Sequence, residues 1–334
     1  MGSGQMVAVF GAYGHTGRFV VKELRERGYV PLLLGRDEEK LRAMAQPGDE
    51  VRQADDLTGA AAVINTAGPF ATTAAKVIEA ALRAGIPYVD VAAEIEANHD
   101  TFQHFTGEAA KTPVIPAMAF FGGLGDLLVT TAMDNWNAAD EAHIAYGLSG
   151  WHPTPGTLAS GAVSGQRRSG RKVRFTGGRL EYHDDPLPTL KWPFPEPLGT
   201  QNVIAEFTMA DVVTIASHLA IPEIRTYMTE KAATDLSAPV NERERPKETF
   251  VVDVRVRKGD EERRVTAEGR DIYATSAPLA VEAVERILTG RTRTKGVASA
   301  GAAFDAPDFL RALSAHVTVR TEAGSTTGTA TAPR

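Results

Sequence analysis

Short apolar runs alternate with longer amphipathic segments over the first third of the chain. The apolar runs cover residues 6–10, 30–34, 62–66, 88–92 and 114–116. Between them, segments with helical spacing cover residues 16–27, 38–45, 72–84 and 96–110. Short runs that are apolar at every position are typical of strands buried on both faces, and their alternation with helices indicates parallel pairing. The pattern predicts a doubly wound α/β domain of the Rossmann type.

The pattern changes after residue 116. Helices are predicted at 126–134, 157–165 and 210–219, and strands at 141–148, 173–175, 202–208, 249–257 and 263–269. Runs of strands with a few helices favour an α+β domain. Five prolines between residues 186 and 197 predict a long irregular loop. Helices at 278–288 and 307–313 are expected to return to the first domain, and residues 322–334 to form a loose end.

These patterns divide the chain into three parts. We expect a dinucleotide-binding domain over residues 6–125, a substrate-binding and dimerisation domain over 126–275, and returning helices over 276–321. A length of 334 residues accommodates two domains with substantial cores.

Composition narrows the function further. The net charge of −6 argues against a nucleic-acid partner. The absence of cysteine removes thiolate nucleophiles, zinc–thiolate sites and iron–sulfur clusters. The histidines lack metal-ligand spacing, so no metal is expected. No apolar run is long enough to cross a membrane, and the start does not resemble a signal peptide, so a cytoplasmic protein is expected.

A GxxGxxG pattern lies between the first predicted strand and the first helix. A glycine-rich turn at this place presents backbone amides and the helix dipole to a pyrophosphate. The first glycine allows the tight turn, the second the approach of the phosphates, and the third close contact between helix and strand. The predicted cofactor-binding residues of this turn are Gly11, Tyr13, Gly14, His15, Thr16 and Gly17.

The residue after the second strand helps to select the dinucleotide. NAD binders usually place an acid there, whereas this chain has Arg36, which suits the 2′-phosphate of NADP. NADP is therefore favoured over NAD, although Asp37 would favour NAD if it turned toward the ribose. A second cofactor loop is predicted after the strand at 62–66, and its candidate residues are Asn65, Ala67, Gly68, Pro69 and Phe70.

Several separated motifs resemble those of the saccharopine dehydrogenase-like oxidoreductases, including their trans-acting enoyl reductase branch. They are GAYGHTGR at 11–18, LLLGRDEEKL at 32–41, NTAGPF at 65–70, IPYVDVAAE at 86–94, the Gly156-Thr157-x-x-Ser160 helix start, and residues 295–297 with 302–304. The resemblance implies a Rossmann domain with an inserted substrate and dimerisation domain, and hydride transfer from NAD(P)H to a C=N or activated C=C bond. Where relatives read Gly-x-Asp-Ser-x-Pro, residues 119–126 read AFFGGLGD. Because of this difference, the substrate of those relatives cannot be assigned to this protein.

Hydride transfer requires a positioned nicotinamide and a proton source beside it. Polar residues near the expected carboxyl ends of the strands or the entry to the second domain form the catalytic shortlist. It consists of Asp90, Glu94, His99, Asp126, Tyr146 and His152. Each also has a structural interpretation, such as anchoring a loop or starting a helix. A basic run from Arg167 to Arg174 could attract an anion or form a solvated face.

The sequence thus predicts an NADPH-dependent reductase of a small metabolite, expected to form a homodimer. Two alternatives remain open: an NADP(H)-binding redox sensor without catalysis, and an NAD(P)-dependent alcohol or amino-acid dehydrogenase. A short-chain dehydrogenase is disfavoured, because the pair Tyr227 and Lys231 lies far from the first domain in a strand-like segment.

Overall fold

The computed structural model describes residues 4–53, 56–236 and 248–326. Its first sheet has six parallel strands in the order β3-β2-β1-β4-β5-β6. The strands are β1 (Met6–Phe10), β2 (Val30–Leu34), β3 (Glu50–Arg52), β4 (Ala62–Asn65), β5 (Tyr88–Asp90) and β6 (Val114–Ile115). This is the strand order of a Rossmann domain, as predicted.

Helices cover both faces of this sheet. They are α1 (His15–Glu26), α2 (Glu38–Met44), α3 (Phe70–Ala84) and α4 (Ile95–Phe105). Val7 and Val9 belong to the core shared with α1, whereas Ala8 belongs to the core shared with α3. Successive strand residues therefore supply opposite layers, which explains why the runs are apolar at every position.

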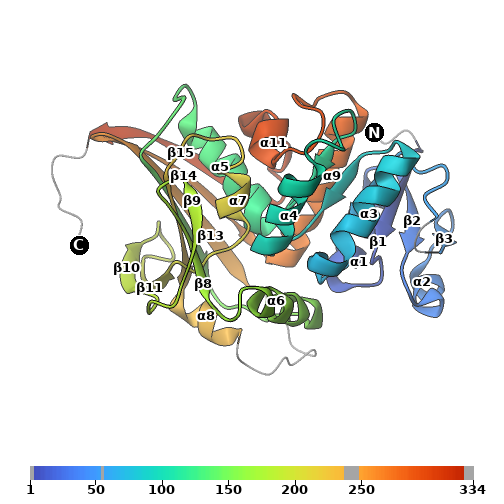
Figure 1. Cartoon of the computed structure of the whole chain (residues 1–334), viewed down its shortest axis with the longest axis horizontal. Coiled ribbons are helices and arrows are strands. Elements are labelled where there is room, and N and C mark those ends of the chain that lie inside the picture. Colours follow the sequence, from blue (N-terminus) through green and yellow to red (C-terminus); the bar gives the residue numbers. More distant parts are fainter. Residues whose placement is uncertain (1–3, 54–55, 237–247, 327–334) are drawn as a thin grey trace.

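The second sheet has nine strands and is mixed (Figure 1). Its main path is β10-β11-β12-β7-β13-β14-β15, with β8 beside β12 and β9 beside β8. The strands are β7 (Glu141–Leu148), β8 (Lys172–Thr176), β9 (Arg179–His183), β10 (Thr189–Pro193), β11 (Thr200–Ala205), β12 (Glu223–Thr229), β13 (Thr249–Lys258), β14 (Glu261–Arg270) and β15 (Val317–Thr326).

A layer of helices joins the two sheets. It contains the kinked segment η1 (Phe120–Leu124), α5 (Gly125–Met133), α7 (Asp211–Thr214), α9 (Ile272–Leu288), α10 (Ala300–Ala303) and α11 (Ala306–Ala312). One continuous core includes Val9 of the first sheet, Leu127 of α5, Val254 of the second sheet and Leu279 of α9. Helix α9 packs against α1, so the chain does return to the first domain before β15 joins the second sheet.

Four expectations about the second half were wrong. The proline-rich stretch contains strand β10, which Pro193 ends at the edge of the sheet, where a missing N–H costs no ladder bond. The helix expected at 210–219 is only α7. Helix α9 begins well before Pro278, because Asp271 caps it by accepting from the amides of Tyr273 and Ala274. The expected loose end forms part of β15 as far as Thr326, and residues 327–334 lie outside the described residues.

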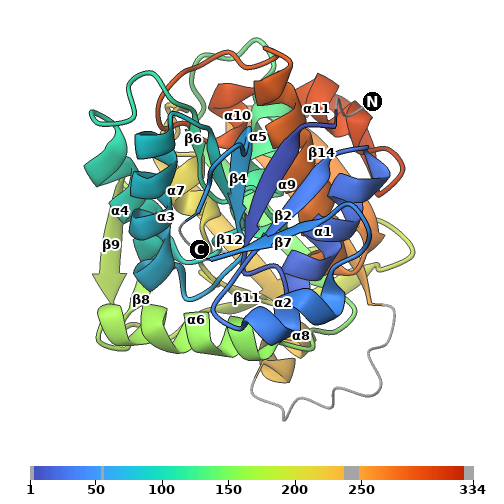
Figure 2. The same ribbon diagram turned by 90° about the vertical axis from the view of Figure 1, so that its right-hand side faces the viewer.

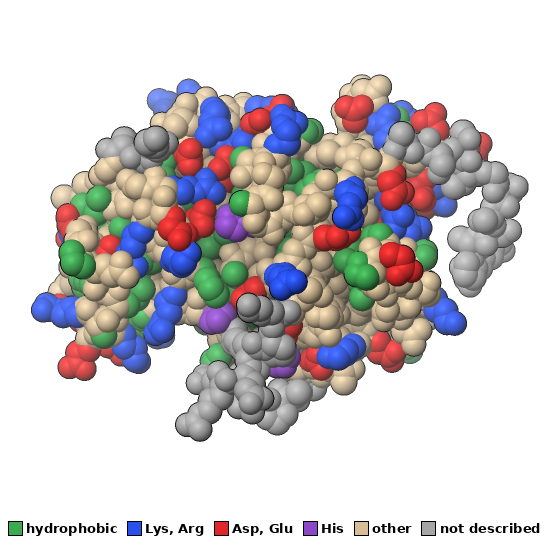
Figure 3. All heavy atoms as spheres, turned by 180° about the vertical axis from the view of Figure 1, so that it is seen from behind, with side chains coloured by type: hydrophobic (Ala, Val, Ile, Leu, Met, Phe, Trp, Pro, Cys, Tyr) green, Lys and Arg blue, Asp and Glu red, His purple; other side chains and the backbone are tan. Residues whose placement is uncertain are grey.

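Helix α6 (Pro155–Arg167) lies between the two halves, whereas α8 (Glu230–Asp235) packs against β11 and β12. Figure 2 shows α6 crossing below the lower end of the first sheet. In the view from behind, acidic and basic side chains are interspersed (Figure 3).

Candidate functional site

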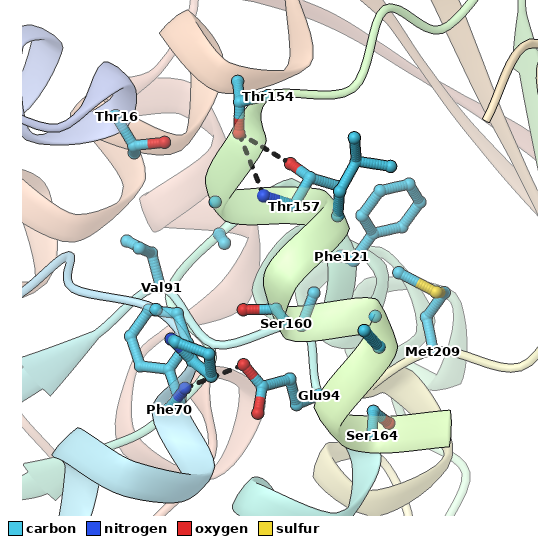
Figure 4. Close-up of a pocket in the computed structure, with 18 of the residues that line it drawn as sticks. Thr16, Phe70, Val91, Glu94, Phe121, Thr154, Thr157, Ser160, Ser164 and Met209 are labelled. Atoms are coloured by element: carbon cyan, nitrogen blue, oxygen red, sulfur yellow. Dashed lines mark hydrogen bonds between the residues drawn. The ribbon is translucent and has the colours of Figure 1, made fainter. Parts of the chain in front are cut away.

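A cavity of about 1120 Å³ lies where the first sheet, η1, α6 and the second sheet meet. Its lining includes the glycine-rich turn, the loop after β4 and the N-terminal half of α6 (Figure 4). Open α/β sheets bind ligands beyond the carboxyl ends of their strands, and this cavity lies there. Its volume slightly exceeds the range of about 300–1,000 Å³ that is usual for small-molecule sites.

The three glycines of the first turn have different structural roles. Gly11 has φ +85°, and a Cβ there would lie 2.8 Å from Ala67 Cβ. A Cβ on Gly17 would collide with the carbonyl oxygen of Gly11, so this residue brings α1 close to β1. Gly14 has the ordinary φ of −65° and precedes α1, where no described side chain caps the helix. The fold therefore requires glycine at positions 11 and 17, whereas Gly14 leaves a space in front of α1 that a ligand can occupy.

The structure brings most of this turn to the cavity. Gly11, Tyr13, Gly14, His15 and Thr16 line it, whereas Gly17 is buried behind them. The amides at the start of α1 thus face a space that could hold a pyrophosphate.

Arg36 also lines the cavity, next to Gly35 at the end of β2. Asp37 does not line it. Its carboxylate accepts from the backbone N of Lys40 and pairs with Lys40 Nζ at 2.8 Å, which caps α2 and lowers the pKa of Asp37. The acid that would have favoured NAD is therefore occupied elsewhere.

The second loop approaches α6. Ala67, Gly68, Pro69 and Phe70 line the cavity, and a Cβ on Gly68 would lie 2.6 Å from Ser160 Oγ of α6. Asn65 lies behind the loop and fixes its shape: its Oδ1 accepts from the backbone N of Ala67 at 3.0 Å, while its Nδ2 donates to Tyr88 Oη at 3.2 Å.

Glu94 is the member of the catalytic shortlist that lines the cavity. Its carboxylate accepts from the backbone N of Phe70 at 2.7 Å and of Ala71 at 3.1 Å. These bonds cap α3 and hold the second loop in place. The geometry makes Glu94 a residue that positions this loop.

The other shortlisted residues lie away from the cavity lining. Asp126 is fully buried, accepts from the backbone N of Gly301 at 2.7 Å and contacts His218 Nε2 at 2.7 Å. Tyr146 is also fully buried, donates to Asp211 Oδ1 at 2.6 Å and has its pKa raised by burial. His99 is exposed on α4, and His152 contacts Glu248.

Asp90 is a buried anchor at the end of β5. Its Oδ1 accepts from the backbone N of Ala92 at 3.0 Å and of Ala117 at 2.8 Å, and its Oδ2 accepts from Tyr88 Oη at 2.8 Å. Burial raises the pKa of Asp90 to about 6, against the effect of these hydrogen bonds. The carboxylate ties β5 to the segment that follows β6.

This raised pKa predicts a pH-dependent stability. Between pH 4 and 6 the folded state holds a proton that the unfolded state releases, so the free energy of unfolding falls as pH rises. Relative to Asp90→Asn, the wild type should lose up to about 3 kcal/mol across this window. Urea denaturation of both proteins at several pH values measures the difference, and a difference independent of pH would contradict the assignment.

A cluster of hydroxyl groups at the start of α6 was missed by sequence reasoning. Tyr273 Oη lies 2.8 Å from Thr157 Oγ1, which lies 2.9 Å from Thr154 Oγ1. Trp151 Nε1 donates to Tyr273 Oη at 3.0 Å. All four residues line the cavity. The Gly-Thr-x-x-Ser motif pointed to Thr157, but no sequence signal identified Tyr273, which is 116 positions away.

Within the described ranges, no group of three or more His, Cys, Asp or Glu side chains could hold a metal ion. In the same part of the chain, no helix is long and apolar enough to span a bilayer.

The first domain matches a family model, and nearly the whole chain aligns with a solved structure. Residues 11–115 match the model of a family described as NAD(P)H-binding. Saccharopine dehydrogenase (L-Glu forming) from Saccharomyces cerevisiae aligns over 96% of this chain and 100% of that chain, with a TM-score of 0.65 and 11% identity. A myo-inositol dehydrogenase from Lactobacillus casei aligns over 96% and 98% of the two chains, with 12% identity and a TM-score of only 0.45. No curated protein matches by sequence.

The family match and the first structural match bear on the predictions. The first domain is an NAD(P)H-binding domain, and the whole chain has the fold of saccharopine dehydrogenase. The expected resemblance is thereby confirmed at the level of the fold.

Proposed function

We propose that this protein is an NADPH-dependent oxidoreductase that reduces a C=N or an activated C=C bond of a small metabolite. One observation carries the proposal. A single cavity runs from the start of α1, where a pyrophosphate would bind, past the second loop and into the second domain. Such a cavity can hold a dinucleotide and a substrate end to end.

The residues divide into three groups by their place in this cavity. Gly14 and the first amides of α1 would hold the pyrophosphate, Arg36 the 2′-phosphate, and residues 67–70 the nicotinamide ribose. When bound, NADPH supplies the hydride. Asn65 and Glu94 hold the second loop in the required shape.

Tyr273 is our candidate for the proton donor. Ser160, which touches the second loop, lies one helical turn from Thr157, so the hydroxyl cluster borders the proposed nicotinamide end. Each hydroxyl in the row can donate or accept. Tyr273 Oη also accepts from the backbone N of Thr154 at 3.4 Å. We propose that Tyr273 gives its proton to the substrate and regains one from Thr157, the next hydroxyl in the row. Trp151 then stabilises the resulting phenolate through its N–H.

Turnover assays test the function. We expect purified protein to consume NADPH with at least one member of two panels, cyclic imines and conjugated enoyl compounds, and to use NADH less well. The responding panel identifies the bond that is reduced. Tight NADPH binding without consumption on either panel would instead favour the redox-sensor alternative.

The preference for NADPH has its own test. Arg36→Ala should weaken NADPH binding by about tenfold to a hundredfold, because a charge-assisted contact to the 2′-phosphate is lost. NADH lacks that phosphate, so its dissociation constant should change little. Isothermal titration calorimetry with both cofactors measures the two effects.

Arg42→Ala is the matched control for this test. Arg42 lies on α2, pairs with Glu38 and does not line the cavity. An equal loss of NADH and NADPH affinity in Arg36→Ala would contradict the role of Arg36 in selecting NADPH.

A further inference from the structure

The second-domain half of the cavity has several large apolar side chains in its lining. Away from the glycine-rich turn, its lining includes Phe121, Trp151, Val173, Phe207, Met209 and Leu236. Leu158 of α6, a residue that is 43% exposed, also lines this space. Together these side chains form an apolar wall that the body of a ligand can cover.

The same half of the cavity is also lined by basic side chains. Of the basic run from Arg167 to Arg174, three members line the cavity: Arg168, Arg171 and Lys172. Arg168 is neutralised, because its guanidinium pairs with Glu96 at 3.3 Å and donates to Ser164 Oγ at 3.0 Å. Arg171 and Lys172 form no ion pair with a carboxylate within the described residues.

Arg171 and Lys172 make contacts with a ring and with carbonyl oxygens, and these contacts do not cancel their positive charge. Arg171 lies over the ring of Tyr182 at 5.2 Å, and its Nε donates to the carbonyl oxygen of Arg168 at 3.4 Å. Lys172 Nζ donates to the carbonyl oxygens of Asp184 and Asp185.

One acid, Glu206, also faces this half of the cavity. Its carboxylate lies 3.3 Å from His183 Nε2. Within the basic run, Arg171 and Lys172 are thus the lining residues whose charge no described carboxylate pairs.

We propose that the substrate is an amphipathic anion, with an apolar body in the second-domain half of the cavity and a carboxylate or phosphate at Arg171 and Lys172. This inference rests on the proposed function, since it assigns the substrate of the same cavity. The reacting bond would lie at the opposite end of the molecule from the anion, beside the second loop. A compact molecule with several carboxylates would leave the apolar lining uncovered.

Binding of simple probes tests the proposal without requiring turnover. Octanoate, octyl phosphate, 1-octanol and butyrate are titrated into the full-length protein saturated with NADP⁺, by isothermal titration calorimetry. We expect one of the two octyl anions to bind at least about tenfold more tightly than 1-octanol, the value typical of a charge-assisted contact. Octanoate should also bind more tightly than butyrate, because it buries more apolar area. The tighter of the two octyl anions identifies the anionic group.

Two variants of the same basic run make the test specific. Arg171→Ala should remove most of the preference for the anion, and Arg171→Ala with Lys172→Ala should remove all of it. Arg174→Ala is the matched control, because Arg174 pairs with Glu181 and Asp185 and does not line the cavity. Unchanged circular dichroism would establish that the variants fold.

Two results would overturn the proposal: equal affinities for 1-octanol and both octyl anions, or an anion preference that survives in the double variant. Failure of the proposed function is a separate outcome. If the protein binds neither NADPH nor NADH, the reductase is refuted, whereas anion binding in the absence of cofactor still reports on this cavity.

Discussion

Replacing Gly14 with leucine should weaken NADPH binding by about two orders of magnitude or more, the loss expected when charge-assisted bonds to a phosphate are blocked. The backbone at Gly14, with φ −65° and ψ 166°, is open to any L-amino acid. A Cβ there would lie 3.0 Å from Gly11 O, a tight contact that a shift of a few tenths of an ångström relieves. The leucine side chain would therefore occupy the space before α1 while the fold persists. Fluorescence or calorimetric titration with NADPH measures the effect.

Gly107→Leu is the matched control for this experiment. Gly107 does not line the cavity, and no heavy atom lies within 4 Å of a Cβ built on it. This variant should bind NADPH like the wild type. If Gly14→Leu kept the wild-type affinity while remaining folded, the glycine-rich turn would not be the dinucleotide site.

The first domain was predictable because its signals are local. The buried strands of the Rossmann sheet form short, mainly apolar runs, and the glycine-rich turn follows one of these runs directly. β3 was missed because Glu50, Val51 and Arg52 form a short, half-buried strand at the edge of the sheet. An edge strand needs no continuous apolar run, so periodicity carries little information there.

The second domain was harder to predict because partners distant in sequence decide its structure. β9 has a burial pattern that follows no clear alternation, and it is held by pairing with β8. β10 was excluded because of its prolines, although Pro193 ends the strand at the sheet edge. A pattern read along the chain cannot tell which strand occupies an edge.

In the candidate site, too, the local part could be predicted and the part formed by distant residues could not. The residues expected to contact the cofactor come from two continuous loops and, for Arg36, from the end of β2, and all but Gly17 and Asn65 line the cavity. The catalytic shortlist came from position along the chain, at strand ends and at the entry to the second domain. Position alone could not distinguish a buried anchor such as Asp90 from a cavity residue. The hydroxyl cluster joins α6 to α9 across 116 positions, a pairing that only the folded chain creates.

Tyr273→Phe should lower kcat by about 10²- to 10⁴-fold on whichever compound the wild type reduces, the usual loss when a general acid is removed. The substitution deletes the Oη atom that contacts Thr157 and Trp151 but keeps the ring, which packs edge-on against His15 at 5.1 Å. The dissociation constant of NADPH should therefore change little. Steady-state kinetics and NADPH titration separate the two quantities.

The pH dependence of kcat distinguishes a proton donor from a structural residue. If Tyr273 donates the proton, the variant should lose both the limb of the wild-type profile that reports this donor and the solvent deuterium isotope effect on kcat. Thr157→Val, which removes the next hydroxyl in the row, should lower kcat less. Tyr29→Phe alters a tyrosine that does not line the cavity and should match the wild type. Tyr273→Phe could instead keep the wild-type pH profile while kcat falls and NADPH binding weakens together. That result would make Tyr273 a packing residue and place the proton source elsewhere in the cavity.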